Sequence, residues 1–234
     1  MLRGLYAAAS AMVAQIARQD VYANNLANVN SVGFRRGQTV LGQFPADLQA
    51  ALGSSGQASG GLAAASSGLD LTQGPLVSTD RPLDLALSGD AFFTVQTPQG
   101  QAFTRDGRFQ LDSQRRLTTL QGNLVLGARG PIALPRGDFS VSAEGQISCQ
   151  GKPVDRLRLL VPAQPQALGN GLYSARSSAV SKGSTVSQGR LEQANVNGVA
   201  EMGRMLSGYR LYEANATSLR YQDETLSSLM KIVQ

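Results

Sequence analysis

Residues 2–26 read LRGLYAAASAMVAQIARQDVYANNL and residues 202–233 read MGRMLSGYRLYEANATSLRYQDETLSSLMKIV, and both repeat apolar side chains at steps of three and four residues. In a helix this spacing gathers the apolar side chains on one face, as in a coiled coil. The N-terminal stripe consists of Leu2, Leu5, Ala9, Met12, Ile16, Ala23 and Leu26. The C-terminal stripe consists of Met202, Leu206, Tyr209, Tyr212, Ala216, Leu219, Leu226, Leu229 and Val233. The sequence therefore predicts two helical arms that flank a non-helical body.

Each predicted arm has an apolar face that requires a packing partner. Such a helix owes most of its stability to burial of that face, at about 1.5–3 kcal/mol for each aliphatic side chain. One arrangement is an intramolecular helical hairpin packed on a globular core. The position of the arms, their alanine content and the flexible connector after the first arm favour packing between subunits.

Composition argues against several functional classes. The chain has 234 residues, a net charge of +5, no histidine, no tryptophan and one cysteine, Cys149. The commonest general base and metal ligand is therefore missing, and an internal disulfide is impossible. Arginines are scattered and only 6% of residues are aromatic, a pattern that argues against nucleic-acid binding. No apolar run of about 18 residues occurs, so we expect no membrane-spanning helix.

The first 16 residues superficially resemble a secretory signal. Arg3 precedes a short alanine-rich run and the small residues Ala9-Ser10-Ala11. The apolar run is short, however, and the helical period continues past these residues to Leu26. We interpret the segment as a retained helix.

Turn-forming residues follow the first stripe. Asn24, Asn25 and Asn28 tolerate the left-handed conformation, and we expect them to end the helix and to set the direction in which the chain leaves it. Gly33 offers a positive φ, and Phe34 is a large apolar anchor.

From residue 69 to about 188 the pattern changes to short apolar segments separated by turns. The predicted strands are Leu83–Leu87, Ala91–Gln96, Ala102–Arg105, Arg108–Leu111, Leu117–Leu120, Leu124–Leu126, Phe139–Ser142, Gln146–Cys149 and Val154–Val161. Turn signals such as Asp106-Gly107 and Glu144-Gly145 separate them. This spacing predicts a mainly antiparallel, sandwich- or barrel-like β domain.

The expected fold class is α+β, with long N- and C-terminal helices that pack as a coiled-coil-like module and flank the β domain. The predicted domains are a helical arm (1–34), an extended connector rich in Gly, Ser and Ala (35–68), the β domain (69–190) and a second helical arm (191–234). The composition of residues 45–68 is typical of a flexible spacer. Asn195 or Asn197 is the expected N-cap of the last helix.

The sequence contains no recognisable catalytic, cofactor-binding or metal-binding constellation, so we expect neither enzymatic activity nor a cofactor. The segment from Gly145 to Lys152 resembles a phosphate-binding loop, but it is one residue too long and Pro153 replaces the required Ser or Thr. Several aspartates could supply a carboxylate pair, but each lies at a strand end or turn, where Asp commonly bonds its own backbone. These residues are Asp80, Asp84, Asp90, Asp106 and Asp112. We expect the Thr104–Gly107 segment to be a hairpin tip.

Three separated sets of motifs resemble those of the bacterial flagellar rod and hook axial proteins. The N-terminal motifs are Ala23-Asn24-Asn25-Leu26-Ala27-Asn28 and Gly33-Phe34-Arg35. The C-terminal motifs are Asn195-Val196-Asn197, Glu201-Met202 and Arg210-Leu211-Tyr212-Glu213-Ala214-Asn215. The middle motifs are Gly89-Asp90-Ala91-Phe92-Phe93-Thr94-Val95 and Phe103-Thr104-Arg105-Asp106-Gly107-Arg108-Phe109. The resemblance covers nearly the whole chain apart from residues 45–68.

Within this family two positions along the rod remain open. Residues Arg81–Leu87 and Gly130–Pro135 look most like the proximal rod subunit. Residues Arg210–Asn215 are closer to the distal rod subunit. The proximal position is our main interpretation and the distal position is the alternative.

The resemblance implies a structural, non-enzymatic subunit of the flagellar basal-body rod, which spans the periplasm. In this family the terminal helices form an inner tube that transmits torque and surrounds the export channel, and the β domain lies outside. The subunits pass unfolded through the flagellar type III export apparatus without a cleaved signal. The expected partners are other rod subunits, further copies in a helical assembly and the export apparatus, with no nucleic acid and no direct membrane insertion.

The expected assembly interface combines residues of both stripes with the turn after the first helix. It consists of Leu5, Met12, Ile16, Asn24, Asn25, Leu26, Asn28, Gly33, Phe34, Met202, Leu206, Tyr209, Tyr212, Asn215, Leu219 and Leu226. Two other classes remain as alternatives. A secreted coiled-coil adhesin or scaffold would bind a host or matrix ligand, and a secreted carbohydrate-active enzyme would use aspartates such as Asp84 and Asp106.

Overall fold

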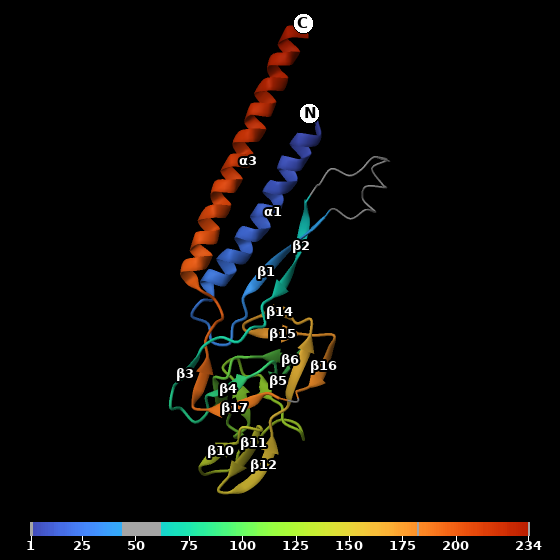
Figure 1. Cartoon of the computed structure of the whole chain (residues 1–234). Coiled ribbons are helices and arrows are strands. Elements are labelled where there is room, and N and C mark those ends of the chain that lie inside the picture. The colour runs from blue at the N-terminus through green and yellow to red at the C-terminus, as the bar shows by residue number, and fades with distance from the viewer. Residues whose placement is uncertain (1, 44–61, 182, 234) are drawn as a thin grey trace. The chain divides into compact units, whose positions relative to one another are not determined.

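The computed structural model describes residues 2–43, 62–181 and 183–233 (Figure 1). The chain divides into two compact units. The helical unit consists of residues 1–27, 37–68 and 197–234, and the β unit consists of residues 28–36 and 69–196. Most of the predicted flexible spacer, residues 45–61, lies outside the described residues.

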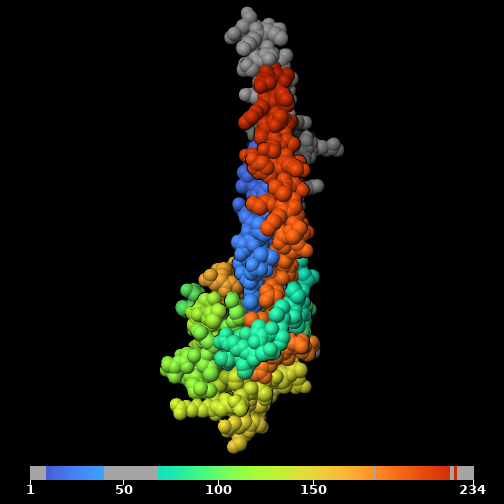
Figure 2. Space-filling model, turned by 90° about the vertical axis from the view of Figure 1, so that its left-hand side faces the viewer, coloured from blue at the N-terminus to red at the C-terminus, as the bar shows by residue number. Residues whose placement is uncertain are grey.

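The helical unit contains helices α1 (Leu2–Ala27) and α3 (Gly198–Val233) and the paired strands β1 (Gly37–Gln43) and β2 (Leu62–Leu69). The backbone N–H of Ala200 donates to Asn197 Oδ1 at 3.1 Å, so the N-cap predicted at Asn197 is confirmed. Glu201 lies in the first turn of α3, where a negative charge favours the helix dipole. Figure 2 shows α1 and α3 side by side along this unit.

The predicted fold class is wrong in how the two arms pack. The described residues contain one N-terminal and one C-terminal helix but no coiled-coil-like module. Small and polar residues lie between α1 and α3: Gln15 is 4% exposed, and a Cβ on Gly208 would lie 2.2 Å from Gln15 Nε2. Gln19 Nε2 donates to the carbonyl of Met205 at 2.9 Å. Because glycine and the glutamine amides occupy the contact, the expected seam residues Ile16 and Leu206 stay 50% and 65% exposed.

The β unit consists of short strands. They are β3 (Leu76–Ser78), β4 (Leu85–Ser88), β5 (Phe92–Thr97), β6 (Gly100–Thr104), β7 (Phe109–Leu111), β8 (Leu117–Thr119), β9 (Leu124–Val125), β10 (Phe139–Val141), β11 (Gln146–Cys149), β12 (Lys152–Arg156), β13 (Leu159–Ala163), β14 (Gln166–Gly169), β15 (Leu172–Ser174), β16 (Ser177–Val180), β17 (Thr185–Gln188) and β18 (Arg190–Glu192).

The β unit is mostly antiparallel, as the sequence predicted, and its strands form four sheets. A nine-stranded sheet follows the order β14-β15-β6-β5-β9-β8-β7, with β13 pairing both β5 and β16. Strands β10, β11 and β12 form a three-stranded sheet, and the pairs β17–β4 and β18–β3 form two small sheets. Strands β3 and β18 are distant in sequence, so their pairing joins the first and last strands of the β unit.

Strand β5 lies at the centre of the unit because both of its faces are buried. Phe93 and Val95 point into the larger core and Phe92 into the smaller one, and all three are at most 1% exposed. This alternation is the period of two expected of a strand. The larger core also contains Leu85, Leu87, Ala102, Phe109, Leu117, Val125, Ile132, Leu134, Ile147, Leu157 and Val186. The smaller core contains Phe92, Phe103, Leu160 and Tyr173.

Across the described residues, no helix combines the length and the apolar character that crossing a membrane requires.

Candidate assembly surface and the Glu192 cluster

An apolar groove runs between α1 and α3 in the helical unit. It has a volume of about 570 Å³ and is lined by Ile16, Gln19, Met202, Met205, Leu206, Tyr209 and Tyr212. Every described residue that lines it is uncharged. Met202 is 51% exposed and Tyr209 is 58% exposed. Large apolar side chains that lie exposed together mark a candidate interaction surface. We call this surface the apolar groove.

A second groove of different chemistry lies between the same two helices. It is lined by Gln15, Arg18, Tyr22, Ala200, Gly203, Arg204, Ser207, Gly208 and Leu211. Two arginines, Arg18 and Arg204, give it a positive charge, and Arg204 pairs with Glu201. We call this surface the polar groove. The helix pair therefore presents one uncharged groove and one groove that contains charged side chains.

The structure brings five of the predicted interface residues together, since Ile16, Met202, Leu206, Tyr209 and Tyr212 all line the apolar groove. The other predicted residues lie elsewhere. In the helical unit Leu5 lies in α1 and Leu226 lies in α3. Asn24 is exposed and Asn25 is buried. The half-buried residues are Met12, Leu26, Asn215 and Leu219. In the β unit Gly33 is buried, and Asn28 and Phe34 are half-buried.

Asn25 connects the end of α1 to the start of β1. Its Nδ2 donates to the carbonyl of Gly37 at 2.9 Å, and its Oδ1 accepts from the N–H of Gly37 at 2.8 Å. The same Nδ2 lies 3.4 Å from Glu201 Oε2. A side-chain amide thus replaces the pair of hydrogen bonds that a neighbouring strand would make. Asn25 fixes the chain where it re-enters the helical unit, rather than only ending the helix.

Replacing Asn25 by aspartate is expected to destabilise the helical unit by about 2 kcal/mol. The carboxylate cannot donate to Gly37 and places a second negative charge beside the buried Glu201. Asn30 is exposed in the turn after α1, so Asn30→Asp is the matched control, with an expected change within about 0.5 kcal/mol. Urea unfolding followed by helical circular dichroism measures both. Equal stability of the two variants would contradict the role given to Asn25.

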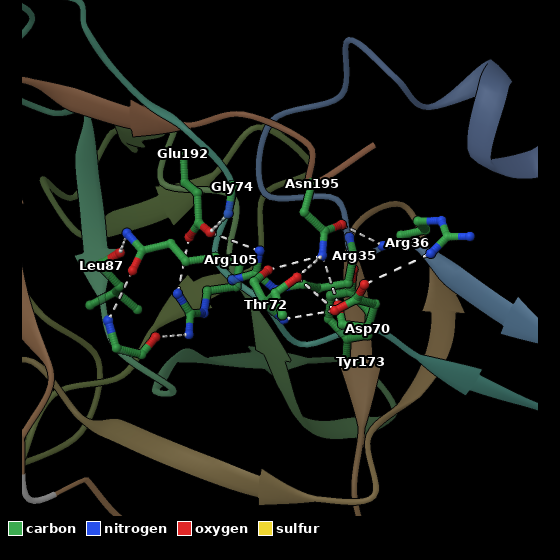
Figure 3. A network of polar contacts seen from close by, with 12 residues as sticks. Arg35, Arg36, Asp70, Thr72, Gly74, Leu87, Arg105, Tyr173, Glu192 and Asn195 are labelled. Atoms are coloured by element: carbon green, nitrogen blue, oxygen red, sulfur yellow. Dashed lines mark hydrogen bonds and ion pairs between the residues drawn. The ribbon is translucent and has the colours of Figure 1, made fainter. Parts of the chain in front are cut away.

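A buried polar cluster holds the β unit together around Glu192 (Figure 3). Glu192 Oε1 accepts from Arg35 Nη1 at 2.7 Å, and its Oε2 accepts from Arg105 Nη1 at 3.0 Å. The N–H of Gly74 also donates to Oε1, at 2.9 Å. All three charged residues are at most 1% exposed. We call these residues the Glu192 cluster.

Two guanidinium groups share one carboxylate in this cluster. Burial is the main cause that lowers the pKa of Arg105 to about 10, and the charge of Arg35 lowers it further, whereas Glu192 raises it. The Arg105 guanidinium also lies 4.8 Å from the centre of the Phe92 ring, and it donates to the carbonyl of Gly89. Burial raises the pKa of Tyr173, so its hydroxyl stays neutral and accepts from the N–H of Arg35 at 3.0 Å.

The chain crosses from one unit to the other after residues 27, 36, 68 and 196. Within the β unit, hydrogen bonds join the segments that lie next to three of these crossings. The N–H of Arg36 donates to Asn195 Oδ1 at 2.7 Å, and the N–H of Asp70 donates to the carbonyl of Arg36 at 2.8 Å. Asn195 Nδ2 donates to the carbonyl of Asp70 at 2.9 Å. Three segments distant in sequence are thereby held in one place.

The Thr104–Gly107 segment is not the hairpin tip that the sequence predicted. Strand β6 before it pairs with β5 and β15, and strand β7 after it pairs with β8. Arg105 instead points into the Glu192 cluster. Sequence reasoning missed Glu192, because it is a single acidic residue in a short strand without a distinctive pattern around it.

The aspartates considered for carbohydrate chemistry are held by turns and arginines. Asp106 accepts from the N–H of Arg108 at 3.0 Å and pairs with its guanidinium at 2.7 Å. Asp112 accepts from the N–H groups of Gln114 and Arg116, and these bonds lower its pKa. The turn chemistry predicted for these two residues is confirmed.

Three family models match this chain in sequence order. The model described as Flagella basal body rod protein matches residues 5–35, and the Flagellar hook protein FlgE/F/G D1 domain matches residues 86–149. The model described as Flagellar basal body rod FlgEFG protein C-terminal matches residues 187–232. The first match contains most of α1, the last contains most of α3, and the middle match contains strands β5 to β11.

Similar proteins align with the chain over nearly their whole length. The flagellar basal-body rod protein FlgG of Bacillus subtilis is 31% identical, with 99% of each chain covered. The rod protein FlgF of Escherichia coli is 33% identical, with 91% of each chain covered. The rod protein FlgF of Mesorhizobium japonicum is 36% identical, with 98% of each chain covered.

Proposed function

Because this chain belongs to the flagellar basal-body rod protein family, we propose that it joins the rod through the apolar groove of its helical unit. The chain is a structural subunit of the flagellar basal body and not an enzyme. It assembles with other rod and basal-body components. The proposal concerns which surface makes that assembly.

The observation that carries the proposal is the exposure of large apolar side chains along one groove. Met202, Leu206 and Tyr209 are each more than half exposed, although Gln15 packs closely against Gly208 and Gln19 hydrogen-bonds to Met205 across α1 and α3. Burying such side chains against a partner contributes about 1.5–3 kcal/mol each. A subunit of a polymer needs apolar area of this kind at positions that its own fold does not cover.

We further propose the proximal segment of the rod as the position of this subunit, on the residues Arg81–Leu87 and Gly130–Pro135. The distal segment remains the alternative, since relatives named FlgF and relatives named FlgG both align over more than 90% of the chain. The same resemblance supports passage of the unfolded chain through the flagellar export apparatus. Electron microscopy of basal bodies from a strain lacking the gene tests the position. Basal bodies that lack the proximal segment of the rod support the first assignment.

Replacing Leu206 by glutamate is expected to abolish swimming. The change places a charge in the uncharged groove, where docking of a partner would remove its hydration. Leu211→Glu is the matched control, because Leu211 lies in the same helix, is 50% exposed and lines the polar groove. Swimming in soft agar and isolation of basal bodies measure both variants in a strain that lacks the native copy.

The control variant is expected to assemble rods and to swim. Hydrogen exchange on the purified variants checks that α1 and α3 stay folded in both. If the Leu206→Glu strain swims like the parent strain, the apolar groove is not the assembly surface.

A further inference from the structure

We propose that strand β16 of one copy pairs edge to edge with strand β3 of a second copy, so that the sheets of two β units become continuous. This contact lies on the β unit and is separate from the apolar groove, so it goes beyond the proposed function. Three observations support it. Both strands have an open edge, the two edges lie on opposite sides of the β unit, and their residues match in one register.

Strand β16 leaves one backbone edge open. Among the described strands it pairs only with β13, and the same register continues in a bond from the N–H of Ser181 to the carbonyl of Leu159 at 3.3 Å. Such bonds alternate along an antiparallel strand, so the N–H and C=O groups of Ser178 and Val180 point away from β13. All residues of β16 are exposed, and Val180 is 74% exposed.

Strand β3 is open in the same way on the side away from β18, its only partner among the described strands. The N–H of Thr79 donates to the carbonyl of Gly189 at 2.8 Å, in the register that pairs β3 with β18. Leu76 and Ser78 alternate with these bonded positions, so their N–H and C=O groups point away from β18. Ser78 is exposed, and Val77 is 45% exposed.

Other edge strands of the β unit carry features that prevent such pairing. Along the open side of β10, Gln188 Oε1 accepts from the N–H of Val141 at 3.0 Å, and its Nε2 donates to the carbonyl of Phe139 at 3.4 Å. Strand β12 contains Pro153, which has no N–H, and β14 has an irregular register with β15. Neither β3 nor β16 contains a proline or a charged residue.

The two open edges lie on opposite sides of the β unit (Figure 1). One copy therefore cannot pair its own β3 with its own β16, and the pairing must join two copies. The contact is heterologous, since two different edges meet. Each copy keeps one edge free for the next copy, so the contact can repeat without closing into a dimer.

The residues of the two strands match when the edges are aligned antiparallel. In one register apolar residues lie opposite apolar residues, and serine lies opposite serine. The opposed pairs are Leu76 with Val180, Val77 with Ala179 and Ser78 with Ser178. The outward groups of both strands coincide in this register, so two of the pairs can exchange about four hydrogen bonds. Cross-strand pairs of these kinds stabilise a sheet, and they cover the exposed valines of both strands.

Charges next to the strands favour the same alignment. Arg176 lies two residues before Ser178, and Asp80 lies two residues after Ser78, so an antiparallel alignment places opposite charges at the same end. Both residues are exposed, and Arg176 has no ion-pair partner among the described residues. The φ of Asp80 is 55°, so the chain turns there and the attraction acts at the end of the strand rather than within the ladder.

Disulfide formation in assembled basal bodies tests the pairing. In a Cys149→Ser background, Ser78→Cys and Ser178→Cys are combined in one full-length chain that replaces the native copy. A hydrogen-bonded antiparallel pair has its Cα atoms about 5.5 Å apart, a distance that a disulfide bridges. The matched control chain combines Ser78→Cys with Ala179→Cys. Ala179 is as exposed to solvent as Ser178 by class, but neighbouring residues of a strand point to opposite faces of the sheet.

We expect the chain with Ser78→Cys and Ser178→Cys to form dimers, trimers and larger species on a non-reducing gel, at least about five times faster than the control chain. Equal rates in the two chains or no cross-linked species would overturn the proposal. Dimers without larger species would also overturn it, because they indicate that two identical edges pair. Swimming confirms that the variants assemble. If a variant strain does not swim, purified chains at high concentration give the same comparison.

This outcome is distinguishable from failure of the proposed function. If Leu206→Glu stops swimming and no cross-linked species form, the apolar groove remains the assembly surface and the β edges do not pair. If cross-linked species form and the Leu206→Glu strain swims normally, the copies assemble through their β units and the groove is not required.

Discussion

Replacing Glu192 by glutamine is expected to lower the free energy of unfolding of the β unit by about 3–5 kcal/mol. The carboxylate is the counter-ion of two guanidinium groups, on Arg35 and Arg105, that are at most 1% exposed. Glutamine keeps the shape of the side chain but leaves both positive charges buried without compensation. The low pKa of Arg105, about 10, shows how poorly the site tolerates positive charge even with Glu192 present.

The charge of Asp90 also acts on Arg105, but less strongly than Glu192 does. Among the described residues, Nε and Nη2 of Arg35 and Nε of Arg105 have no hydrogen-bond partner. Hydrogen exchange across strands β5 and β6 measures the effect on the β unit separately from the helices. Glu144→Gln is the control, because Glu144 is exposed and a surface change of this kind alters stability by no more than about 0.5 kcal/mol. A Glu192→Gln protein as stable as this control would show that the cluster does not hold the β unit.

Replacing Gly107 by alanine is expected to destabilise the β unit by about 3 kcal/mol. An added Cβ would lie 1.6 Å from the carbonyl oxygen of Leu85 and 2.7 Å from its carbonyl carbon. Both are backbone atoms of β4, and Leu85 itself is 2% exposed in the core. The strand must therefore move, which breaks the bond from the N–H of Leu85 to the carbonyl of Gly107, now 3.1 Å.

Gly183→Ala is the matched control for this change. No described atom lies within 4 Å of a Cβ added at Gly183. Alanine allows the unfolded chain fewer conformations than glycine does. The substitution is therefore expected to be neutral there or to stabilise the protein by about 0.4–1 kcal/mol. Urea unfolding of the two variants compares the same glycine-to-alanine change at a site without space for the methyl group, Gly107, and at a site with space for it, Gly183. Similar midpoints would show that β4 and the Arg105–Arg108 segment adjust without cost.

The strands with clear alternation could be predicted from the sequence, and the exposed ones could not. The segment Ala91–Gln96 corresponds closely to β5, because Phe92 and Phe93 fill two cores on opposite faces. The predicted strand Val154–Val161 is two strands, β12 and β13, separated at Leu157 and Arg158. Strands β14 and β16 are exposed along their whole length, so they carry no burial pattern to detect.

The apolar stripes identified five of the seven residues that line the apolar groove, but not which side of each helix faces the other helix. Periodicity places Ile16 and Leu206 on helix faces, yet it cannot tell which face meets the other helix. That choice depends on close approach at Gly208 and on the amides of Gln15 and Gln19, which are polar and carry no stripe. The Glu192 cluster was out of reach for a related reason: its members are 157 and 87 residues apart in sequence and meet only in the folded unit.

These separations also decide when the β unit can fold. Contacts between residues far apart in sequence form slowly, because a long loop must close before they stabilise anything. Strand β18 and Glu192 lie near the C-terminal end of the β unit, so Arg35 and Arg105 lack this counter-ion until the ribosome has passed residue 192. A nascent chain of this protein therefore stays open for almost the whole of its translation.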